Sequence, residues 1–327
     1  MYSQIKHFHL PDVQQACELM RIISAAKSVY HPRKIDRPLA LYGAGDLGRL
    51  ARKFLDKLKI PIEFVVDVRA KKVRKDPFWD GVQIVSPDQV GQKERKTILL
   101  ALAVVNAPYC DIASNLHRSG WVDVIPFYDI AEAYRNWHPL TNGWFSGPLT
   151  ANDVSHLNTV LLQWSDDVSR AHHIQFLAWR CIRQEWIFSL APVTIDDRYF
   201  IPEITNRLSE NEIFADIGAH IGSVSQKFIK IVNENFNKIL MFEPDSINRI
   251  NLETNVLEIS SDLHNKIQVS SDFIGQGRRN VLFAEGYGYA SRAFQLGSKL
   301  LNKVSIDDLD MSPTFIKLHI EGGELEA

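Results

Sequence analysis

The sequence predicts an α/β protein with two Rossmann-like parallel-sheet units that are joined by a helical segment. Two glycine-rich turns, at 43–48 and 218–222, each follow a short apolar run and precede a helical pattern. About 20 residues after each turn, a second apolar run ends in an acid, Asp67 or Glu243. Strands that alternate with helices in this way form parallel sheets with helices on their faces.

Length and composition limit the class of protein. A chain of 327 residues is expected to hold two domains, and a hydrophobic content of 45% supplies ordinary soluble cores. A formal net charge of −2 argues against a nucleic-acid-binding protein that relies on a broad basic face. No apolar run is long enough to span a bilayer, and the polar first ten residues are not a secretory signal. The isolated cysteines, Cys17, Cys110 and Cys181, indicate a reducing compartment, so we expect a cytoplasmic protein.

The first part of the chain divides into two predicted segments. Residues 1–36 form an N-terminal helical segment, because apolar side chains recur on one side of a helix over 11–26. Residues 37–136 form the first α/β unit. We expect its strands at 39–42, 64–66, 97–105 and 122–127, with 81–85 continuing the second strand, and its helices at 49–58 and 112–119.

The first glycine turn matches the dinucleotide fingerprint. Gly43, Gly45 and Gly48 have the required spacing, and Asp67 is placed to meet a ribose. This part also resembles the Rossmann-like N-terminal domains of bacterial surface-sugar enzymes, some of which hold a nucleotide sugar. Against a pyrophosphate, Asp46 could cap the following helix itself. A purely structural or oligomerising unit therefore stays open, and the basic run at 69–75 is either a solvated loop or a phosphate-binding rim.

A linker and a helical lead-in are expected over 137–199, and the second unit over 200–327. Gly, Pro and Asn are frequent in 137–150, and 151–189 is predicted to be helical. Trp164, Phe176, Trp179 and Trp186 would supply much of the apolar area of that helical stretch. In the second unit we expect a helix at 223–232 and strands at 213–215, 239–242, 267–270, 279–283 and 315–320.

The second glycine turn favours a cationic ligand over a phosphate. Asp216 stands just before Gly218, Ala219 and Gly222, where it would repel a pyrophosphate. S-adenosylmethionine has no phosphate and carries an amino group and a sulfonium. Glu243 is placed to accept hydrogen bonds from both ribose hydroxyls of such a ligand. Asp272, after the third strand, could meet the adenine amino group or be a turn residue, and a plain glycine turn is the alternative for the whole motif.

With these residues in place, the second half of the chain resembles the FkbM-type methyltransferase family. The resemblance follows an ordered set of motifs: 214–222, 242–244, Asn255, 304–309 and 315–324, with 165–170 and 179–180 similar to the helical lead-in of many members. It implies methyl transfer from S-adenosylmethionine to a hydroxyl, on a small-molecule or glycan acceptor such as a sugar or glycoconjugate precursor.

Two features depart from the family pattern. His319 stands where the family has Asp, and the chain ends at Ala327 within the helix expected after Gly323. We therefore expect the second unit to be incomplete at its C-terminus, with the strand at 315–320 on a sheet edge. The activity of this chain by itself stays open for the same reason.

His319 and Glu321 are the candidate catalytic residues. They are two positions apart at the carboxyl end of a predicted strand, where ligands of open α/β sheets bind, so both side chains could point to the same face. An imidazole is a reasonable base for a hydroxyl. The alternative for His319 is an ordinary hydrogen-bonded histidine. Glu321 and Glu324 could hold Mg²⁺, although stabilisation by the dipole of the following helix is the simpler interpretation of Glu324. No His or Cys cluster has zinc spacing. Lys317 is expected to snorkel or to be paired, and 286–292 to be a lid or, more simply, a hairpin turn.

Two other functions remain as alternatives. An NAD-dependent sugar oxidoreductase or epimerase would work through the first unit, but no Tyr-x-x-x-Lys pair follows its predicted sheet. A non-catalytic scaffold that binds a nucleotide sugar is the second alternative, and a homo-oligomer is left open.

Overall fold

The computed structural model describes residues 2–27, 31–138, 140, 145–193, 198–277 and 279–327. The chain forms two compact units, one of Met1–Arg135 with Gly143–Val193 and one of Asn136–Asn142 with Thr194–Ala327. The expected segment 1–36 belongs to the same unit as the first sheet. The expected segment 137–199 is split, because 143–193 also belongs to that unit and the rest belongs to the second. No helix among the described residues is long and apolar enough to cross a membrane.

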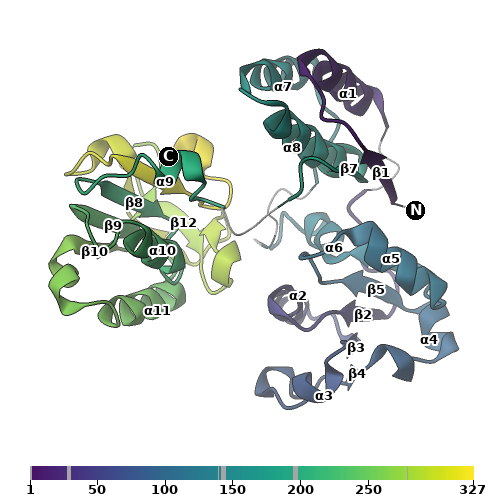
Figure 1. Ribbon diagram of the computed structural model, residues 1–327. Coiled ribbons are helices and arrows are strands. Elements are labelled where there is room, and N and C mark those ends of the chain that lie inside the picture. Colours follow the sequence, from purple (N-terminus) through teal and green to yellow (C-terminus); the bar gives the residue numbers. More distant parts are fainter. Residues whose placement is uncertain (1, 28–30, 139, 141–144, 194–197, 278) are drawn as a thin grey trace. The chain divides into compact units, whose positions relative to one another are not determined.

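The first unit contains a five-stranded parallel sheet in the order β4-β3-β2-β5-β6 (Figure 1). The strands are β2 (Leu39–Tyr42), β3 (Ile62–Val66), β4 (Ile84–Val85), β5 (Leu99–Leu102) and β6 (Asp123–Pro126). The helices α2 (Asp46–Lys57), α3 (Ala70–Val73), α4 (Gln92–Thr97), α5 (Tyr109–Arg118) and α6 (Phe127–Ala133) connect or follow them. Ala40, Leu41 and Leu100 are fully buried, as expected for central strands covered on both faces.

One expectation for this unit is wrong, and two of its helices were missed. Residues 81–85 do not continue the second strand, because α3 and a 3₁₀ turn (Pro77–Trp79) intervene and β4 then pairs in parallel with β3. The helices α4 and α6 were not predicted. Their sequences give no helical stripe, since α4 has no buried residue and α6 is buried along nearly its whole length.

The helical part of the first unit includes a strand that the local pattern did not reveal. Helices α1 (Val13–Ala25), α7 (Ala151–Gln163) and α8 (Asp167–Leu177) share a core with a π-helical turn at Ala178–Ile182. The stretch 151–189 is not wholly helical, because β7 (Gln184–Phe188) pairs in parallel with β1 (Ser3–His7). Trp186 is buried in this core, whereas Trp164 and Phe176 are 41% and 56% exposed and supply less apolar contact than expected.

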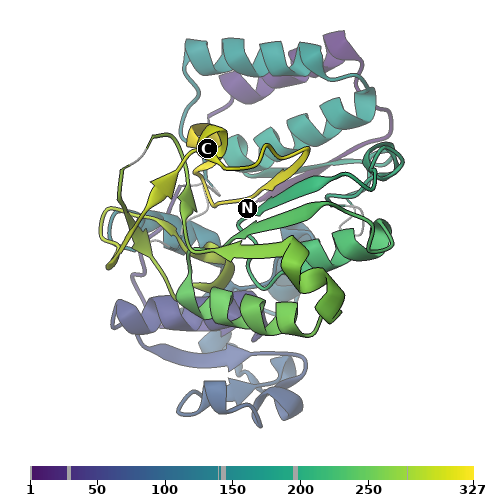
Figure 2. The same cartoon turned by 90° about the vertical axis from the view of Figure 1, so that its left-hand side faces the viewer.

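The second unit contains a four-stranded parallel sheet in the order β10-β9-β8-β16. Its strands are β8 (Ile213–Ile217), β9 (Lys238–Phe242), β10 (Ile267–Ser270) and β16 (Phe315–Leu318), and its helices are α9 (Pro202–Thr205), α10 (Ser223–Ile231) and α11 (Ser246–Leu257). Figure 2 shows these strands side by side. Among the described strands of this sheet, β16 is an edge strand, as predicted.

Short strands follow the main sheet. β11 (Phe273–Ile274) pairs in parallel with β15 (Lys303–Val304). The strand expected at 279–283 is instead β12 (Val281–Ala284), which forms a separate antiparallel sheet with β13 (Arg292–Ala293) and β14 (Lys299–Leu301). The segment 286–292 is therefore the connection of an antiparallel hairpin, which was the simpler of the two interpretations.

Candidate functional site

Four strand ends meet at one edge of the second sheet. In the register, Ile217 of β8 lies beside Phe242 of β9 and Leu318 of β16, and Phe242 lies beside Ser270 of β10. The residues that follow these ends are Gly218, Glu243, Asp272 and His319, all of which were singled out from the sequence. The carboxyl ends of parallel strands are where open α/β sheets bind their ligands.

The glycine loop after β8 needs glycine at two positions for steric reasons. Gly218 has φ +78°, and a Cβ there would lie 1.9 Å from the carbonyl oxygen of His319. Gly222 has φ +86°, and a Cβ there would lie 2.7 Å from Cδ1 of Leu252. Any side chain at these positions would displace the loop or its neighbours. The loop therefore passes as close to the neighbouring strand end and helix as a backbone can.

The loop is also held by hydrogen bonds from the next strand. The amides of Gly218 and Ala219 donate to the carbonyl of Phe242 at 2.9 and 3.0 Å. Asn255 on α11 donates to the carbonyl of Ile221 at 2.8 Å, which gives this predicted motif residue a defined role in holding the loop.

Glu243 lies beneath the loop with both carboxylate oxygens engaged. Oε2 accepts a hydrogen bond from the amide of His220 at 2.7 Å, and Oε1 accepts one from the amide of Asp245 at 2.9 Å. The side chain is almost fully buried, and this burial raises the pKa of Glu243 to about 7, against the opposing effect of the hydrogen bonds. Glu243 thus fixes the loop, and its contact with a ribose stays a prediction.

Asp216 does not face the ligand side of the loop as the sequence suggested. Its carboxylate is fully buried, with Oδ1 2.9 Å from Nζ of Lys317 and Oδ2 accepting from the hydroxyl of Ser225 at 2.7 Å. Lys317 also donates to the carbonyls of Ile217 and Gly218 at 3.3 and 2.5 Å. The cation that neutralises Asp216 is therefore a protein ammonium, and the pair supports the loop from within the sheet. The expectation that Lys317 is paired is met.

His319 and Glu321 lie together at the end of β16. Nε2 of His319 is 3.4 Å from Oε1 of Glu321, and the backbone amide of His319 donates to the carbonyl of Ile217. Burial lowers the pKa of His319, and the nearby cations Arg198 and Lys317 lower it further. The imidazole is therefore neutral at pH 7 and can accept a proton. Burial and the neighbouring Glu324 raise the pKa of the Glu321 carboxyl.

Two residues beside His319 were not identified from the sequence. The hydroxyl of Tyr199 is 3.1 Å from Nδ1 of His319, and Nη2 of Arg198 is 3.3 Å from the same atom. Both residues precede α9 and lie about 120 positions before His319, so no local pattern connects them to it. Their position at the start of the second unit was the only available signal.

The remaining acids of the predicted site accept hydrogen bonds from nearby loop groups. Asp272 accepts from two side chains, the hydroxyl of Ser270 at 2.8 Å and the side-chain amide of Asn302 at 3.1 Å, as a turn residue would. Glu324 accepts from the amides of Ile320 and Gly322, both at 2.8 Å. Among the described residues, no group of three His, Cys, Asp or Glu side chains could hold a metal ion. The structure thus offers no support for the expected Mg²⁺ site.

The first unit repeats the architecture of this loop. Gly43 has φ +103°, and a Cβ on Gly48 would lie 2.2 Å from the carbonyl oxygen of Gly43. Oδ2 of Asp67 accepts from the amide of Ala44 at 2.8 Å, just as Glu243 accepts from His220, and both pairs are 23 residues apart. Gly45 is the N-cap of α2 and no side chain caps this helix, so the expectation that Asp46 caps it is wrong. In the basic run at 69–75, Arg74 bonds to the carbonyl of Ile84 and so helps to hold β4.

Comparison with known proteins supports the fold assignment. No family model matches the sequence, and no curated protein matches it. Among solved structures, the chain is similar to the crystal structure of Methyltransferase FkbM from Methylobacillus flagellatus KT, with 18% sequence identity and a TM-score of 0.61. The match covers 97% of this chain and 84% of that one. The chain has the fold of an FkbM methyltransferase. The resemblance seen in the second half of the sequence is thereby confirmed for the fold, and the structural match extends into the first unit.

In this FkbM-type fold, the predicted glycine loops and their acids fall into two groups. Gly218, Ala219, Gly222 and Glu243 form one hydrogen-bonded loop, with His319 directly against it. Gly43, Gly45, Gly48 and Asp67 form the corresponding loop of the other unit.

Proposed function

We propose that the second unit binds S-adenosylmethionine and transfers its methyl group to a hydroxyl of a sugar or glycoconjugate precursor. The observation that carries this proposal is the convergence of a glycine loop, a strand-end acid and a neutral histidine at one sheet edge. The fold of an FkbM methyltransferase supports S-adenosylmethionine as the methyl donor. His319 at this edge supports a hydroxyl oxygen as the acceptor atom.

The loop supports the donor through the way it is held. Gly218 and Gly222 let the loop pack directly against the end of β16 and against α11, where a Cβ would clash, and this packing fixes the backbone that the donor would meet. Glu243 has carboxylate lone pairs beyond the two that accept backbone amides, and these could accept ribose hydroxyls. The buried Asp216–Lys317 pair holds the loop in place before any ligand arrives.

The chain's contribution to the reaction is alignment and proton transfer. When bound, S-adenosylmethionine supplies a methyl group already activated on a sulfonium. Arg198 can only donate to Nδ1 of His319, so Nε2 of the neutral ring carries the proton and faces Glu321, which orients the imidazole. The acceptor hydroxyl would replace the Tyr199 hydroxyl or Arg198 at Nδ1 and give its proton to this nitrogen, so that the oxygen gains the methyl group as it loses the proton. Positioning of donor and acceptor supplies most of the rate enhancement in such a displacement.

Calorimetric titration distinguishes this proposal from its alternatives. S-adenosylhomocysteine, the demethylated product, should bind the chain in a one-to-one ratio, and NAD should bind far more weakly. Tight binding of NAD with no binding of S-adenosylhomocysteine would contradict the proposal and favour an oxidoreductase or epimerase. Binding of S-adenosylhomocysteine without methyl transfer to any sugar acceptor would favour the non-catalytic scaffold.

The loop of the first unit supports a second candidate function, which concerns ligand binding alone. Its glycines and Asp67 have the geometry of the dinucleotide fingerprint, so this unit could recruit a nucleotide sugar for the second unit. Titration with a uridine diphosphate sugar tests it, and binding should be lost in Gly48→Ala. Self-association remains a separate prediction that sedimentation can test.

A further inference from the structure

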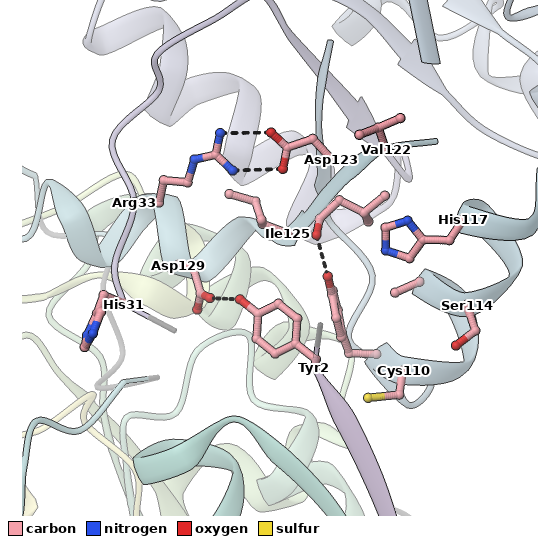
Figure 3. Close-up of a pocket in the computed structure, with 13 residues that line it drawn as sticks. Tyr2, His31, Arg33, Cys110, Ser114, His117, Val122, Asp123, Ile125 and Asp129 are labelled. Atoms are coloured by element: carbon pink, nitrogen blue, oxygen red, sulfur yellow. Dashed lines mark hydrogen bonds and ion pairs between the residues drawn. The ribbon is translucent and has the colours of Figure 1, made fainter. Parts of the chain in front are cut away.

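A cavity of about 410 Å³ lies in the first unit, between the edge strand β6 and helix α5 (Figure 3). This volume falls within the range of roughly 300–1,000 Å³ that is usual for small-molecule sites. The glycine loop at 43–48 does not line it. Its wall combines residues from the N-terminus, the link before β2, α5 and β6: Tyr2, Arg33, Tyr109, Ser114, His117 and Asp123.

The charged groups of the cavity are already paired with one another. Arg33 forms two parallel hydrogen bonds with Asp123, at 2.8 and 2.9 Å, as Figure 3 shows. Asp129 accepts from the guanidinium of Arg183 at 2.6 Å and from the hydroxyl of Tyr2. A charged ligand would compete with the partner that each of these groups already has, whereas a neutral ligand leaves the pairs intact.

Polar and aromatic groups nevertheless face the cavity. Nδ1 of His117 is 2.8 Å from the carbonyl of Trp121, which can only accept, so Nδ1 carries the proton. In the tautomer with its proton on Nδ1, Nε2 can accept a hydrogen bond, and Figure 3 shows the ring among the other lining residues. Ser114, one helical turn before His117, adds a hydroxyl that can donate and accept. The rings of Tyr2 and Tyr109 pack edge to face, with centroids 4.6 Å apart, and give the cavity an apolar side.

We propose that this cavity binds a neutral, hydroxyl-rich ligand of monosaccharide size. Paired charges favour a neutral ligand over an ionic one. The Ser114 hydroxyl, the His117 imidazole and the aromatic wall suit a sugar ring that presents hydroxyls on its rim and C–H groups on its face. The proposal uses residues of the first unit alone and does not depend on methyl transfer by the second.

Titration of the full chain with simple sugars tests the proposal. The probes are the neutral methyl glycosides of glucose, galactose and mannose, with glucuronate and glucosamine as charged counterparts. Saturation-transfer NMR measures the binding of each. At least one neutral glycoside should bind with a Kd on the order of 1 mM or tighter, and the charged sugars at least about tenfold more weakly. Failure of all three neutral glycosides to bind, or equal binding of the charged sugars, would overturn the proposal.

Two variants locate the binding. Ser114→Trp fills the cavity mouth from an exposed position on α5 and should weaken glycoside binding at least about tenfold. Asn115→Trp, at the next exposed position and outside the lining, should leave it unchanged. Asp123→Asn removes one negative charge from the pair with Arg33 and should shift the preference towards glucuronate. Equal effects of the two Trp variants, with both melting as the unmodified chain does, would place the binding elsewhere and refute this site.

Discussion

At the scale of single residues, Glu243 has the most unusual titration in the candidate site. Its carboxyl has an ordinary pKa of 4.5, and burial raises this to about 7 in the folded chain. Between these two pH values the folded state binds more protons at this position than the unfolded state. Glu243 therefore contributes stability that is fully present below pH 4.5 and is lost as the pH rises through 7.

Replacing this residue should flatten that dependence. The difference in stability between the unmodified chain and Glu243→Gln should fall by on the order of 3 kcal/mol from pH 4.5 to pH 7.5. Urea denaturation at a series of pH values measures it. A difference that stays constant across this range would show that the carboxyl is not shifted.

His319 is the residue on which the proposed chemistry depends. His319→Gln should lower kcat for methyl transfer by about 10²–10⁴-fold and leave the affinity for S-adenosylhomocysteine unchanged, because only proton transfer is lost. His264→Gln, a histidine away from this edge, is the matched control. The rate of the unmodified chain should fall as the pH drops below the pKa of His319, which lies below 6.5. If His319→Gln matches the control, His319 is an ordinary hydrogen-bonded histidine.

Individual site residues were predictable where spacing along the chain fixed them. Gly218, Gly222 and Glu243 were identified from the loop pattern, and the structure gives each a steric or hydrogen-bonding reason. Asp216 was placed correctly in the fold, but its partner was not foreseen, because pairing with Lys317 depends on two strands a hundred residues apart. Tyr199 and Arg198 were missed for the same reason.

At the scale of elements, the pairing of β8 with β16 decides the shape of the glycine loop. Asp216 and Lys317 face each other in the register, and their side chains are only 0% and 4% exposed. Removing one partner of a buried ion pair leaves the other charge without compensation. The pair therefore stabilises the second unit only while both members are present.

Lys317→Met should destabilise the second unit by about 3–5 kcal/mol, as measured by urea denaturation. The double variant Asp216→Asn with Lys317→Met should cost less than this single change, because no buried charge then remains. Lys230→Met, exposed on α10, serves as the control and should cost less than about 0.5 kcal/mol. A cost for Lys317→Met equal to that of the control would contradict the role of the pair.

Elements were predictable from sequence where a single helix or strand carries its own pattern. Strands β2, β8, β9 and β10 and helices α1 and α10 lie where expected, within a few residues. The pattern failed where pairing is distant. β7 exists because β1, from the start of the chain, lies beside it, and β12 turns away from the parallel sheet to form a hairpin.

At the scale of the whole molecule, the chain uses the same loop architecture twice. Each unit has a strand, a glycine loop, a helix, a second strand and an acid that accepts a hydrogen bond from the loop amide. The sequence predicted both copies, together with the α/β class. It could not predict which helices and strands join each unit, since that depends on contacts between distant segments such as 1–36 and 143–193. We propose that only the second copy holds the methyl donor.

A matched pair of glycine substitutions tests this claim most directly. Gly218→Ala would place Cβ 1.9 Å from a carbonyl oxygen in the second unit, and Gly48→Ala would place it 2.2 Å from one in the first. Calorimetric titration with S-adenosylhomocysteine should show affinity reduced at least about tenfold in Gly218→Ala and unchanged in Gly48→Ala. Circular dichroism should show both variants folded. Binding that survives Gly218→Ala, or that is lost in Gly48→Ala, would contradict the account.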